Sequence, residues 1–359
     1  MSGIRRRDFV ILLGCGTVAA WPVAARAQQP AVPIVSLVSG RSPEVSARSA
    51  ASFRKGLIET GYVEDQNVKV EYHWLEGQYD RLPSLIADVI RRRVAVITTT
   101  AENAARAAKA ATATIPIVFS VGEDPVKLGL VTSLAHPGGN ATGINFFASE
   151  VVAKRLGLLH NLVPKAVRVA VLVNPTNSST AEATLREIPK AANAIGLQIQ
   201  VLNASTGGQI EAAFATLVRD RADALFVAPD GFFVSRRVQF ATLAARYAIP
   251  AAFTFRENVE AGGLMSYGTD NLEVFRQVGV YTGQILKGAK PAELPVFAVN
   301  QIRVRHQPAN GKGARPGGAA DTARPCRRGD RVSELPWALR TRMDETAPFD
   351  STGFFRWCF

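Results

Sequence analysis

Residues 32–40 read Val-Pro-Ile-Val-Ser-Leu-Val-Ser-Gly, a run of β-branched and other apolar residues that closes on a small polar residue and a glycine. Such a run is typical of a buried strand and the loop that follows it. Residues 46–60 come next, with apolar positions about one helical turn apart, and Gly61 follows them. This spacing predicts an amphipathic helix that ends at the glycine.

The same strand-then-helix alternation continues to residue 120. The further strands expected are 68–74, 94–99 and 115–120, and the helices expected are 81–92 and 101–111. An alternation of this kind predicts a parallel sheet with helices on both faces and right-handed crossovers.

A second series begins at residues 168–174, which read Arg-Val-Ala-Val-Leu-Val-Asn. Its further expected strands are 198–202, 224–228, 249–253 and 263–267, and its expected helices are 179–195, 208–219 and 234–247. Two successive series predict an α/β protein of two Rossmann-like lobes with parallel sheets and a ligand cleft between them. The glycine-rich residues 138–143 lie between the series and are the predicted hinge.

We assign the body of the chain to these two lobes. The N-terminal lobe is expected to hold residues 28–143 plus about 270–290, and the C-terminal lobe residues 144–269 plus about 291–302.

The first 27 residues have the order of an export signal. Residues 5–7 are three arginines, residues 9–23 are mostly apolar, and residues 25–27 read Ala-Arg-Ala. This order predicts a cleaved signal peptide, by the general or the twin-arginine route, and hence a periplasmic protein. Leu-Leu-Gly before Cys15 is a loose match to a lipoprotein signal, and we expect Cys15 to be part of the apolar run instead.

Charge and cysteine content exclude several classes of protein. The formal net charge of +12 is concentrated in the termini, because residues 28–300 hold 27 Lys and Arg against 23 Asp and Glu. A body so close to balance carries no nucleic-acid-binding signature. It also holds no cysteine, since two of the three lie at Cys326 and Cys358 and the third is in the signal. No disulfide, thiol nucleophile or cysteine metal site is expected there.

The C-terminal tail differs in character from the lobes. Residues 311–331 are rich in Gly, Pro, Ala and Arg without strand or helix periodicity, a composition typical of disorder. A one-base shift of the coding frame near Ile302 permits the reading Phe-Glu-Phe-Val-Ile-Asn-Leu, which is strand-like. We therefore hypothesise that residues 303–359 are not the evolved C-terminus. The alternative is a natural basic tail, and resequencing the gene distinguishes the two.

Candidate ligand-binding residues follow from the topology, because open parallel sheets bind ligands outside the carboxyl ends of their strands. The residues chosen are Ser39, Thr99, Thr100, Ser120 and Asp124 in the first lobe, and Asn145, Asn174, Ser178, Asp230 and Glu257 in the second. Small polar side chains of this kind hydrogen-bond a solute, and helix amino ends favour its anionic group. For each residue singly, helix capping is the competing explanation.

Other residues near the expected strand ends complete the candidate site. Arg41, Glu102 and Asn177 are three of them. Aromatic walls are expected from Phe146, Phe147, Phe232 and Phe233, for which core packing is the alternative.

Signatures of catalysis are scarce. The chain has no phosphate-binding Gly-x-x-x-x-Gly-Lys loop and no Gly-x-Ser-x-Gly elbow, and His73, His136 and His160 lack the spacing of a zinc site. No metal or cofactor is expected. Asp124, Asp230 and Glu257 leave open a hydrolase with paired carboxylates, the enzymatic alternative.

Four stretches carry a family resemblance: residues 115–126 (IPIVFSVGEDPV), 130–143 (LVTSLAHPGGNATG), 260–268 (EAGGLMSYG) and 287–295 (KGAKPAELP). They resemble the substrate-binding proteins of ABC transporters related to tryptophan-binding TrpX-type proteins, with the type 1 periplasmic-binding fold. The resemblance spans about residues 30–300.

The resemblance implies a monomeric binding protein without catalytic activity. A small organic solute, an amino acid or a carboxylate, would be captured by closure of the lobes and passed to the membrane permease of an importer. The alternatives are an enzyme that uses the same cleft and a ligand-sensing partner of a membrane receptor. The chain departs from the family after about residue 302, so the second lobe is expected to lack its last strand and helix.

Overall fold

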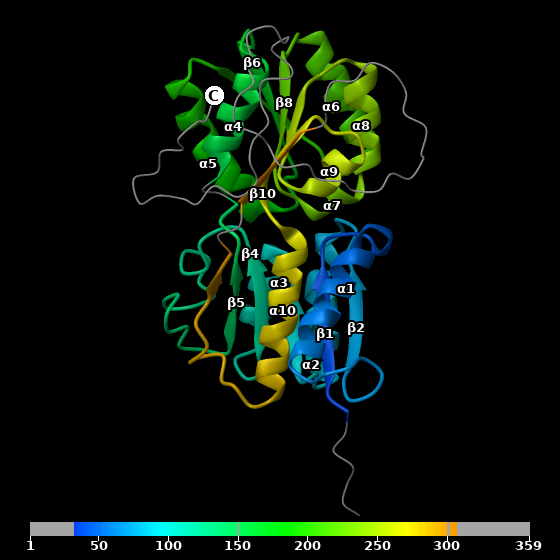
Figure 1. The fold of residues 1–359 in the computed structure, drawn as a ribbon, viewed down its shortest axis with the longest axis vertical. Helices are drawn as coiled ribbons and strands as arrows, with labels where there is room; N and C mark the ends of the chain where they lie inside the picture. The colour runs from blue at the N-terminus through cyan, green and yellow to red at the C-terminus, as the bar shows by residue number, and fades with distance from the viewer. Residues whose placement is uncertain (1–31, 149–150, 300–301, 307–359) are drawn as a thin grey trace, which may run out of the picture.

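The computed structural model describes residues 32–148, 151–299 and 302–306. Figure 1 shows two α/β lobes stacked along the long axis, with the first series of elements in the lower lobe and the second series in the upper one. The two-lobed parallel architecture predicted from the sequence is therefore confirmed. The signal peptide and the tail beyond residue 306 lie outside the described residues.

The first lobe contains a six-stranded parallel sheet in the order β11-β5-β4-β3-β1-β2. Its strands are β1 (Ile34–Ser39), β2 (Lys69–Trp74), β3 (Val96–Thr99), β4 (Ile117–Val121), β5 (Ala141–Asn145) and β11 (Phe297–Ala298). Its helices are α1 (Pro43–Glu59), α2 (Leu82–Arg91), α3 (Glu102–Ala111) and α10 (Asn271–Leu286), with a short 3-10 turn at Tyr79–Arg81.

The second lobe repeats this plan in the order β12-β10-β9-β8-β6-β7. Its strands are β6 (Arg168–Val173), β7 (Gln198–Asn203), β8 (Ala224–Val227), β9 (Ala251–Phe253), β10 (Met265–Thr269) and β12 (Ile302–His306). Its helices are α4 (Val152–Leu162), α5 (Ser178–Ala194), α6 (Gly207–Arg219), α7 (Gly231–Ser235), α8 (Arg237–Arg246) and α9 (Arg256–Glu260). β12 pairs with β10 antiparallel, and the other pairs are parallel.

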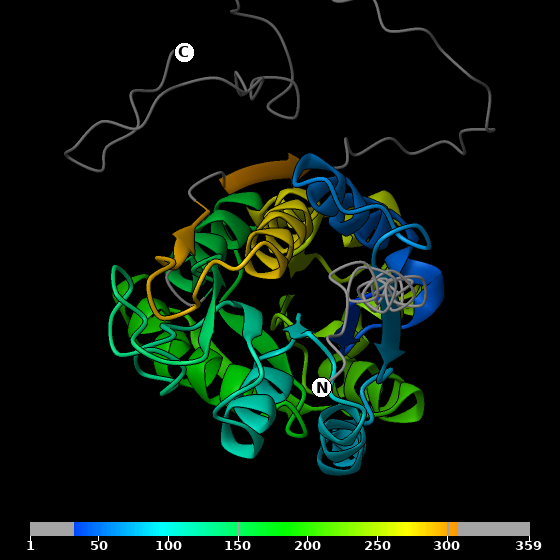
Figure 2. The same cartoon turned by 90° about the horizontal axis from the view of Figure 1, so that it is seen from below.

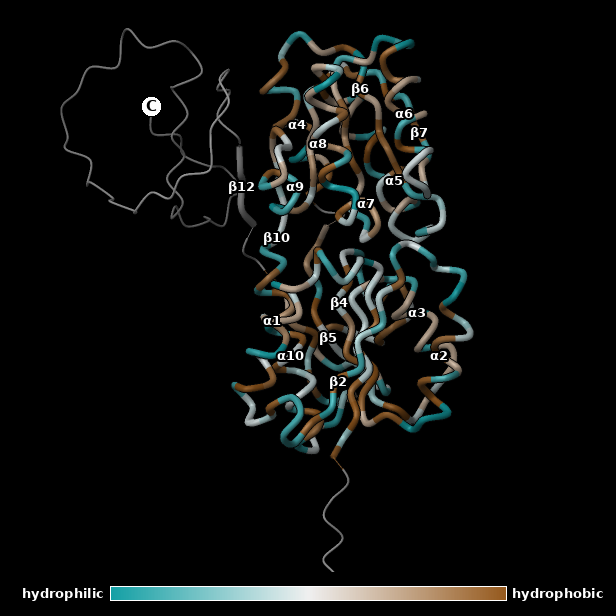
Figure 3. The backbone as a smooth tube through the Cα atoms, turned by 90° about the vertical axis from the view of Figure 1, so that its right-hand side faces the viewer, coloured by the Kyte–Doolittle hydropathy of each residue, from teal (hydrophilic) through white to brown (hydrophobic). Residues whose placement is uncertain are grey.

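Each sheet has an apolar core on both faces, because successive side chains of a strand point to opposite sides. In β1, Val35 and Leu37 pack with residues of α1 and α10, and Val38 packs with residues of α2 and α3. In the second lobe, one core lies under α4 and α5 and the other under α6 and α8. Figure 3 shows the apolar strands inside each lobe. Buried strands of this kind read as continuous apolar runs, which is why the sequence identified them.

The helix α10 returns from the second lobe to the first and packs against α1. Figure 2 shows the two helices side by side, and their contact is backbone to backbone. A Cβ atom added at Gly279 would lie 2.1 Å from the carbonyl oxygen of Phe53, and one added at Gly56 would lie 1.9 Å from that of Arg276. The glycines therefore set how closely the returning helix approaches.

Two expectations about the lobe boundaries are wrong. The predicted hinge at residues 138–143 runs into β5, which pairs with β4 inside the first sheet. The glycines there start a strand on the side away from the second lobe, so the lobes connect after β5, after β10 and after β11 instead. Residues 291–299 also belong to the first lobe, because β11 pairs with β5.

The last strand of the second lobe, which the family resemblance implied was lacking, is present as β12. The last helix and the proposed frameshift concern residues outside those described, and the frameshift remains a hypothesis. Among the described residues, no helix is both long and apolar enough to span a bilayer.

Candidate functional site

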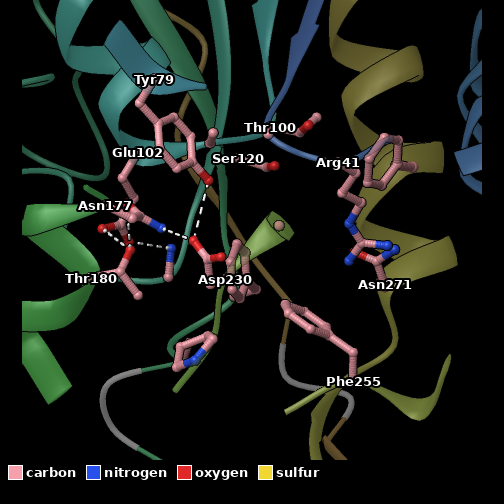
Figure 4. Close-up of a pocket in the computed structure, with 18 residues that line it drawn as sticks. Arg41, Tyr79, Thr100, Glu102, Ser120, Asn177, Thr180, Asp230, Phe255 and Asn271 are labelled. Atoms are coloured by element: carbon pink, nitrogen blue, oxygen red, sulfur yellow. Dashed lines mark hydrogen bonds between the residues drawn. The ribbon is translucent and has the colours of Figure 1, made fainter. Parts of the chain in front are cut away.

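A pocket lies between the lobes, where the carboxyl ends of the two sheets face each other (Figure 4). The first lobe contributes residues that follow β1, β3, β4 and β5, and the second lobe contributes residues that follow β6, β8 and β9. The cavity measures about 70 Å³.

Asp230 occupies one side of the pocket. It is the N-cap of α7, and its Oδ1 accepts hydrogen bonds from the backbone N–H of Phe233 at 3.1 Å and from Asn174 Nδ2 at 3.2 Å. Its Oδ2 accepts from Asn177 Nδ2 at 2.9 Å and from the hydroxyl of Tyr79 at 3.2 Å. Tyr79 belongs to the first lobe, so this carboxylate joins the lobes. Figure 4 shows Tyr79 and Asn177 converging on it.

Glu102, the first residue of α3, is a second buried carboxylate in the wall. Its Oε1 accepts from the backbone N–H of Gly122 at 3.0 Å and of Glu123 at 2.9 Å. Its Oε2 accepts from the hydroxyl of Thr180 in the second lobe at 3.0 Å. Glu102 therefore ties together two strand ends of its own lobe and the first turn of α5 in the other.

Burial changes the proton affinity of these groups. It raises the pKa of Asp230 and of Glu102, while the hydrogen bonds that each carboxylate accepts oppose the rise. It also raises the pKa of Tyr79 well above its usual value, so this hydroxyl is a donor at neutral pH. Three of the four donors to Asp230 are N–H groups, which favour its ionised form.

Arg41 lies on the opposite side of the pocket. Its side chain is 6% exposed and forms an ion pair with Glu257 of the second lobe at 3.1 Å. Asn271, at the start of α10, donates to the same Glu257 oxygen at 3.2 Å. The guanidinium carbon of Arg41 lies 4.9 Å from the ring centre of Phe255. Burial raises the pKa of Glu257, but the charge and hydrogen bond of Arg41, a backbone hydrogen bond and the charge of Arg48 together outweigh it, and the net shift is downward.

The apolar part of the wall is aromatic. Phe146 follows β5, Phe255 follows β9 and Phe275 lies in α10, and all three line the pocket. Phe232 and Phe233, expected as walls, pack in the core of the second lobe instead.

Several further contacts hold the lobes together around the pocket. Arg48 pairs with Glu260 at 2.9 Å, Arg186 pairs with Glu123, and the backbone N–H of Ser42 donates to Ser235 Oγ at 2.9 Å. In α3, Arg106 donates a hydrogen bond to Ser179 Oγ, and Asn103 donates one to the backbone carbonyl of Thr176. The structure is therefore a closed conformation.

Three of the ten predicted ligand residues line the pocket: Thr100, Ser120 and Asp230. The Oγ1 of Thr100 is buried and has no hydrogen-bond partner within the described part of the chain. Two others contact lining residues from behind, since Asn174 bonds Asp230 and Glu257 pairs with Arg41. Their part in binding a solute remains a prediction.

The other five predicted residues lie outside the lining, and most have local roles. Ser39 and Thr99 are buried within their strands. The side chain of Asp124 accepts from the backbone N–H of Val126, and that of Asn145 accepts from the N–H of Phe147. Ser178 is exposed at the first residue of α5. For these residues the local explanation fits better than ligand contact.

Tyr79, Thr180 and Asn271 line the pocket and were not predicted. Tyr79 comes from a 3-10 turn, and Thr180 and Asn271 come from the first turns of helices. A sequence signal exists only for Asn271, which comes soon after an expected strand. Among the described residues, no group of three or more His, Cys, Asp or Glu side chains is arranged to hold a metal ion.

Comparisons with known proteins agree on one family. The family model described as ABC transporter substrate binding protein matches residues 31–304. A tyrosine-binding protein of Clostridioides difficile (strain R20291) is 27% identical over 259 residues, which cover 72% of this chain and 73% of that protein.

Two solved structures have similar folds. A conserved domain protein from Vibrio cholerae has a TM-score of 0.69 at 22% identity, covering 77% of this chain and 92% of its own. An ABC domain from Streptococcus pneumoniae, in complex with L-Trp, has a TM-score of 0.64 at 25% identity, covering 74% of this chain and 88% of its own.

Proposed function

Because the chain belongs to the ABC transporter substrate-binding protein family, we propose that it captures one small organic solute, an amino acid or a small carboxylate, between its lobes. The closed, loaded protein then delivers this solute to the membrane permease of an ABC importer. We place it in the periplasm, as the N-terminal signal predicts.

The observation that carries this proposal is the sharing of one pocket by both lobes. Asp230 accepts a hydrogen bond from Tyr79 of the other lobe, and Glu257 forms an ion pair with Arg41 of the other lobe. A solute bound between such groups contacts both lobes only when they are closed, so it favours the closed state over the open one. The tyrosine-binding relative and the L-Trp complex point to amino acids as the first solutes to test.

Isothermal titration of the full chain against the common amino acids and small carboxylates tests the capture step. We expect at least one solute to bind with a dissociation constant in the micromolar range or tighter and to be recovered chemically unchanged. Conversion of the solute would favour the cleft enzyme instead. Absence of binding across the panel would contradict the proposal.

Uptake tests the delivery step. Cells that carry the gene should accumulate the labelled solute faster than cells from which it is deleted, and Arg41→Ala should reduce the difference. Equal uptake with and without the gene would remove the importer role, while leaving solute capture intact.

A further inference from the structure

Building on the proposed function, the charges of the pocket point to a more specific substrate class: the solute must carry a positively charged nitrogen, and a solute whose only charge is a carboxylate is rejected. The choice between amino acid and simple carboxylate is thereby made in favour of the ammonium group.

The first argument is the charge balance of the wall. Three charged side chains line the pocket: Arg41, Glu102 and Asp230. Arg41 is neutralised by its ion pair with Glu257 at 3.1 Å. Among the described residues, neither Glu102 nor Asp230 makes an ion pair, and both are buried. The wall therefore holds two carboxylates without an ion-pair partner and one cation, Arg41, which is already paired with Glu257.

The nearest cations on adjoining elements are engaged elsewhere. Arg106, one turn along α3 from Glu102, donates to Ser179. Arg186 of α5 pairs with Glu123 and Glu187. Neither lines the pocket. Buried carboxylates are normally paired with a cation, so a cationic solute supplies what the wall lacks.

The second argument concerns the helices that begin at the pocket. Helix amino ends attract anions, and the sequence led us to expect that they would favour the anionic group of the solute. Each of three such helices instead begins with an acidic residue of this chain: α3 with Glu102, α7 with its N-cap Asp230, and α10 with its N-cap Asp270. The positive ends of these three helices are therefore already compensated, which makes them poor sites for the anionic group of a solute.

The third argument is the aromatic wall. The faces of aromatic rings attract cations. The guanidinium carbon of Arg41 already lies 4.9 Å from the ring centre of Phe255 and 6.0 Å from the ring centre of Phe275. Phe146, Phe255 and Phe275 line the same pocket as the two carboxylates. Such a wall accepts an ammonium group attached to an apolar body.

Matched sets of three solutes test the inference by isothermal titration of the full chain at neutral pH. Each set comprises an amino acid, the amine formed by removing its carboxylate, and the acid formed by removing its ammonium group. Tyrosine, tyramine and 3-(4-hydroxyphenyl)propionate form one set, and leucine, 3-methylbutylamine and 4-methylpentanoate another. We expect every acid to bind at least 30-fold more weakly than the best ammonium-bearing member of its set.

The inference would be overturned by an acid that binds less than 30-fold more weakly than the best ammonium-bearing member of its set. The proposed capture of a solute would still stand. If no member of any set binds, both this inference and the proposed capture of amino acids fail. This outcome differs from strong binding of an acid, in which only the inference fails.

Variants identify the groups responsible. Asp230→Asn and Glu102→Gln remove one charge each, and the measurement is the ratio of acid to amino-acid affinity. Circular dichroism shows which variants fold. In each variant that folds, we expect the difference in affinity between the acid and the amino acid to become at least tenfold smaller. Asp223→Asn is the matched control, because Asp223 accepts only the backbone N–H groups of Val167 and Arg168 away from the pocket. A ratio unchanged in both pocket variants would assign the selectivity to other groups and refute the charge argument.

Discussion

Asp230 shows how one residue serves folding and the pocket together. Its Oδ1 caps α7 at Phe233 and its Oδ2 accepts the hydroxyl of Tyr79 across the cleft. An Asp after a strand and before a helix is an ordinary N-cap in sequence terms. Its contact with the opposite lobe depends on how the lobes meet, which no local pattern encodes. For this residue the capping and pocket explanations are therefore both correct.

Solute affinity should depend on pH through Asp230 and Glu102. Burial raises the pKa of both carboxylates, so the folded protein holds more protons than the unfolded chain between the ordinary and the raised values. Unliganded stability therefore falls as pH rises through this window, and a cationic solute offsets the loss. We expect its affinity to fall as pH is lowered through the same window.

Titration calorimetry from pH 4 to 8 measures this dependence. Glu257 should contribute little, because Arg41 keeps its pKa below the usual value. Asp230→Asn should flatten the profile. An affinity that stays constant, or rises on acidification, would contradict the assignment.

Arg155 offers a second test at the scale of one residue. It is fully buried in α4, donates to the hydroxyl of Thr254 and lies 4.3 Å from the ring centre of Phe226. Its Nε and Nη2 have no hydrogen-bond partner among the residues that the structure describes, and burial lowers its pKa to about 9. Replacing a poorly compensated buried charge by an apolar side chain of similar length stabilises a protein by roughly 1–3 kcal/mol.

Arg155→Met should therefore raise the free energy of unfolding measured by urea denaturation. The control is Arg219→Met, whose side chain is 72% exposed and should change stability little. A marked loss of stability in Arg155→Met would mean that the guanidinium has a compensating partner.

At the scale of elements, strands that are buried on both faces, such as β1 and β6, could be predicted from the sequence. It missed β5, because Ala-Thr-Gly-Ile-Asn at residues 141–145 has a glycine at its centre and follows two more. Composition favoured a hinge there, while the neighbouring β4 makes it a strand. The position of α10 against α1 was also inaccessible, since it depends on a contact between residues more than 200 positions apart.

That helix contact has a direct test in Gly279→Ala. The new Cβ atom would lie 2.1 Å from the carbonyl oxygen of Phe53, so α1 and α10 must move apart. Overpacking of this kind costs about 1–3 kcal/mol. Gly157→Ala is the matched control, because Gly157 lies inside α4 with nothing within 4 Å of the new atom. There alanine should stabilise the helix by roughly 0.5–1 kcal/mol.

Thermal and urea unfolding of both variants measure the difference. Opposite signs for the two substitutions would support backbone-to-backbone packing of α1 and α10. Equal effects would show that Gly279 is not confined as described.

At the scale of the whole molecule, closure brings two backbones together at the rim of the pocket. A Cβ atom added at Gly231 of α7 would lie 2.8 Å from the carbonyl carbon of Gly40 in the other lobe. Gly231→Ala should therefore hold the lobes slightly apart without disturbing either core. We expect solute affinity to fall by about 10- to 100-fold, because the closed state becomes less populated.

Small-angle scattering follows the shape change, and the solute-saturated variant should keep a larger radius of gyration than the parent protein. The unfolding free energy without solute should change by less than about 0.5 kcal/mol, since the contact is at the surface of each lobe. Parent-like affinity and parent-like contraction would show that Gly40 and Gly231 do not meet in the loaded protein.

The most direct test of the whole account is a crystal structure of the full chain with its tightest solute. The account predicts density between the lobes, with a positively charged nitrogen of the solute beside Asp230 or Glu102 and its apolar body against Phe255. A solute bound outside this pocket, or one that turns a carboxylate toward those two acidic residues, would contradict it.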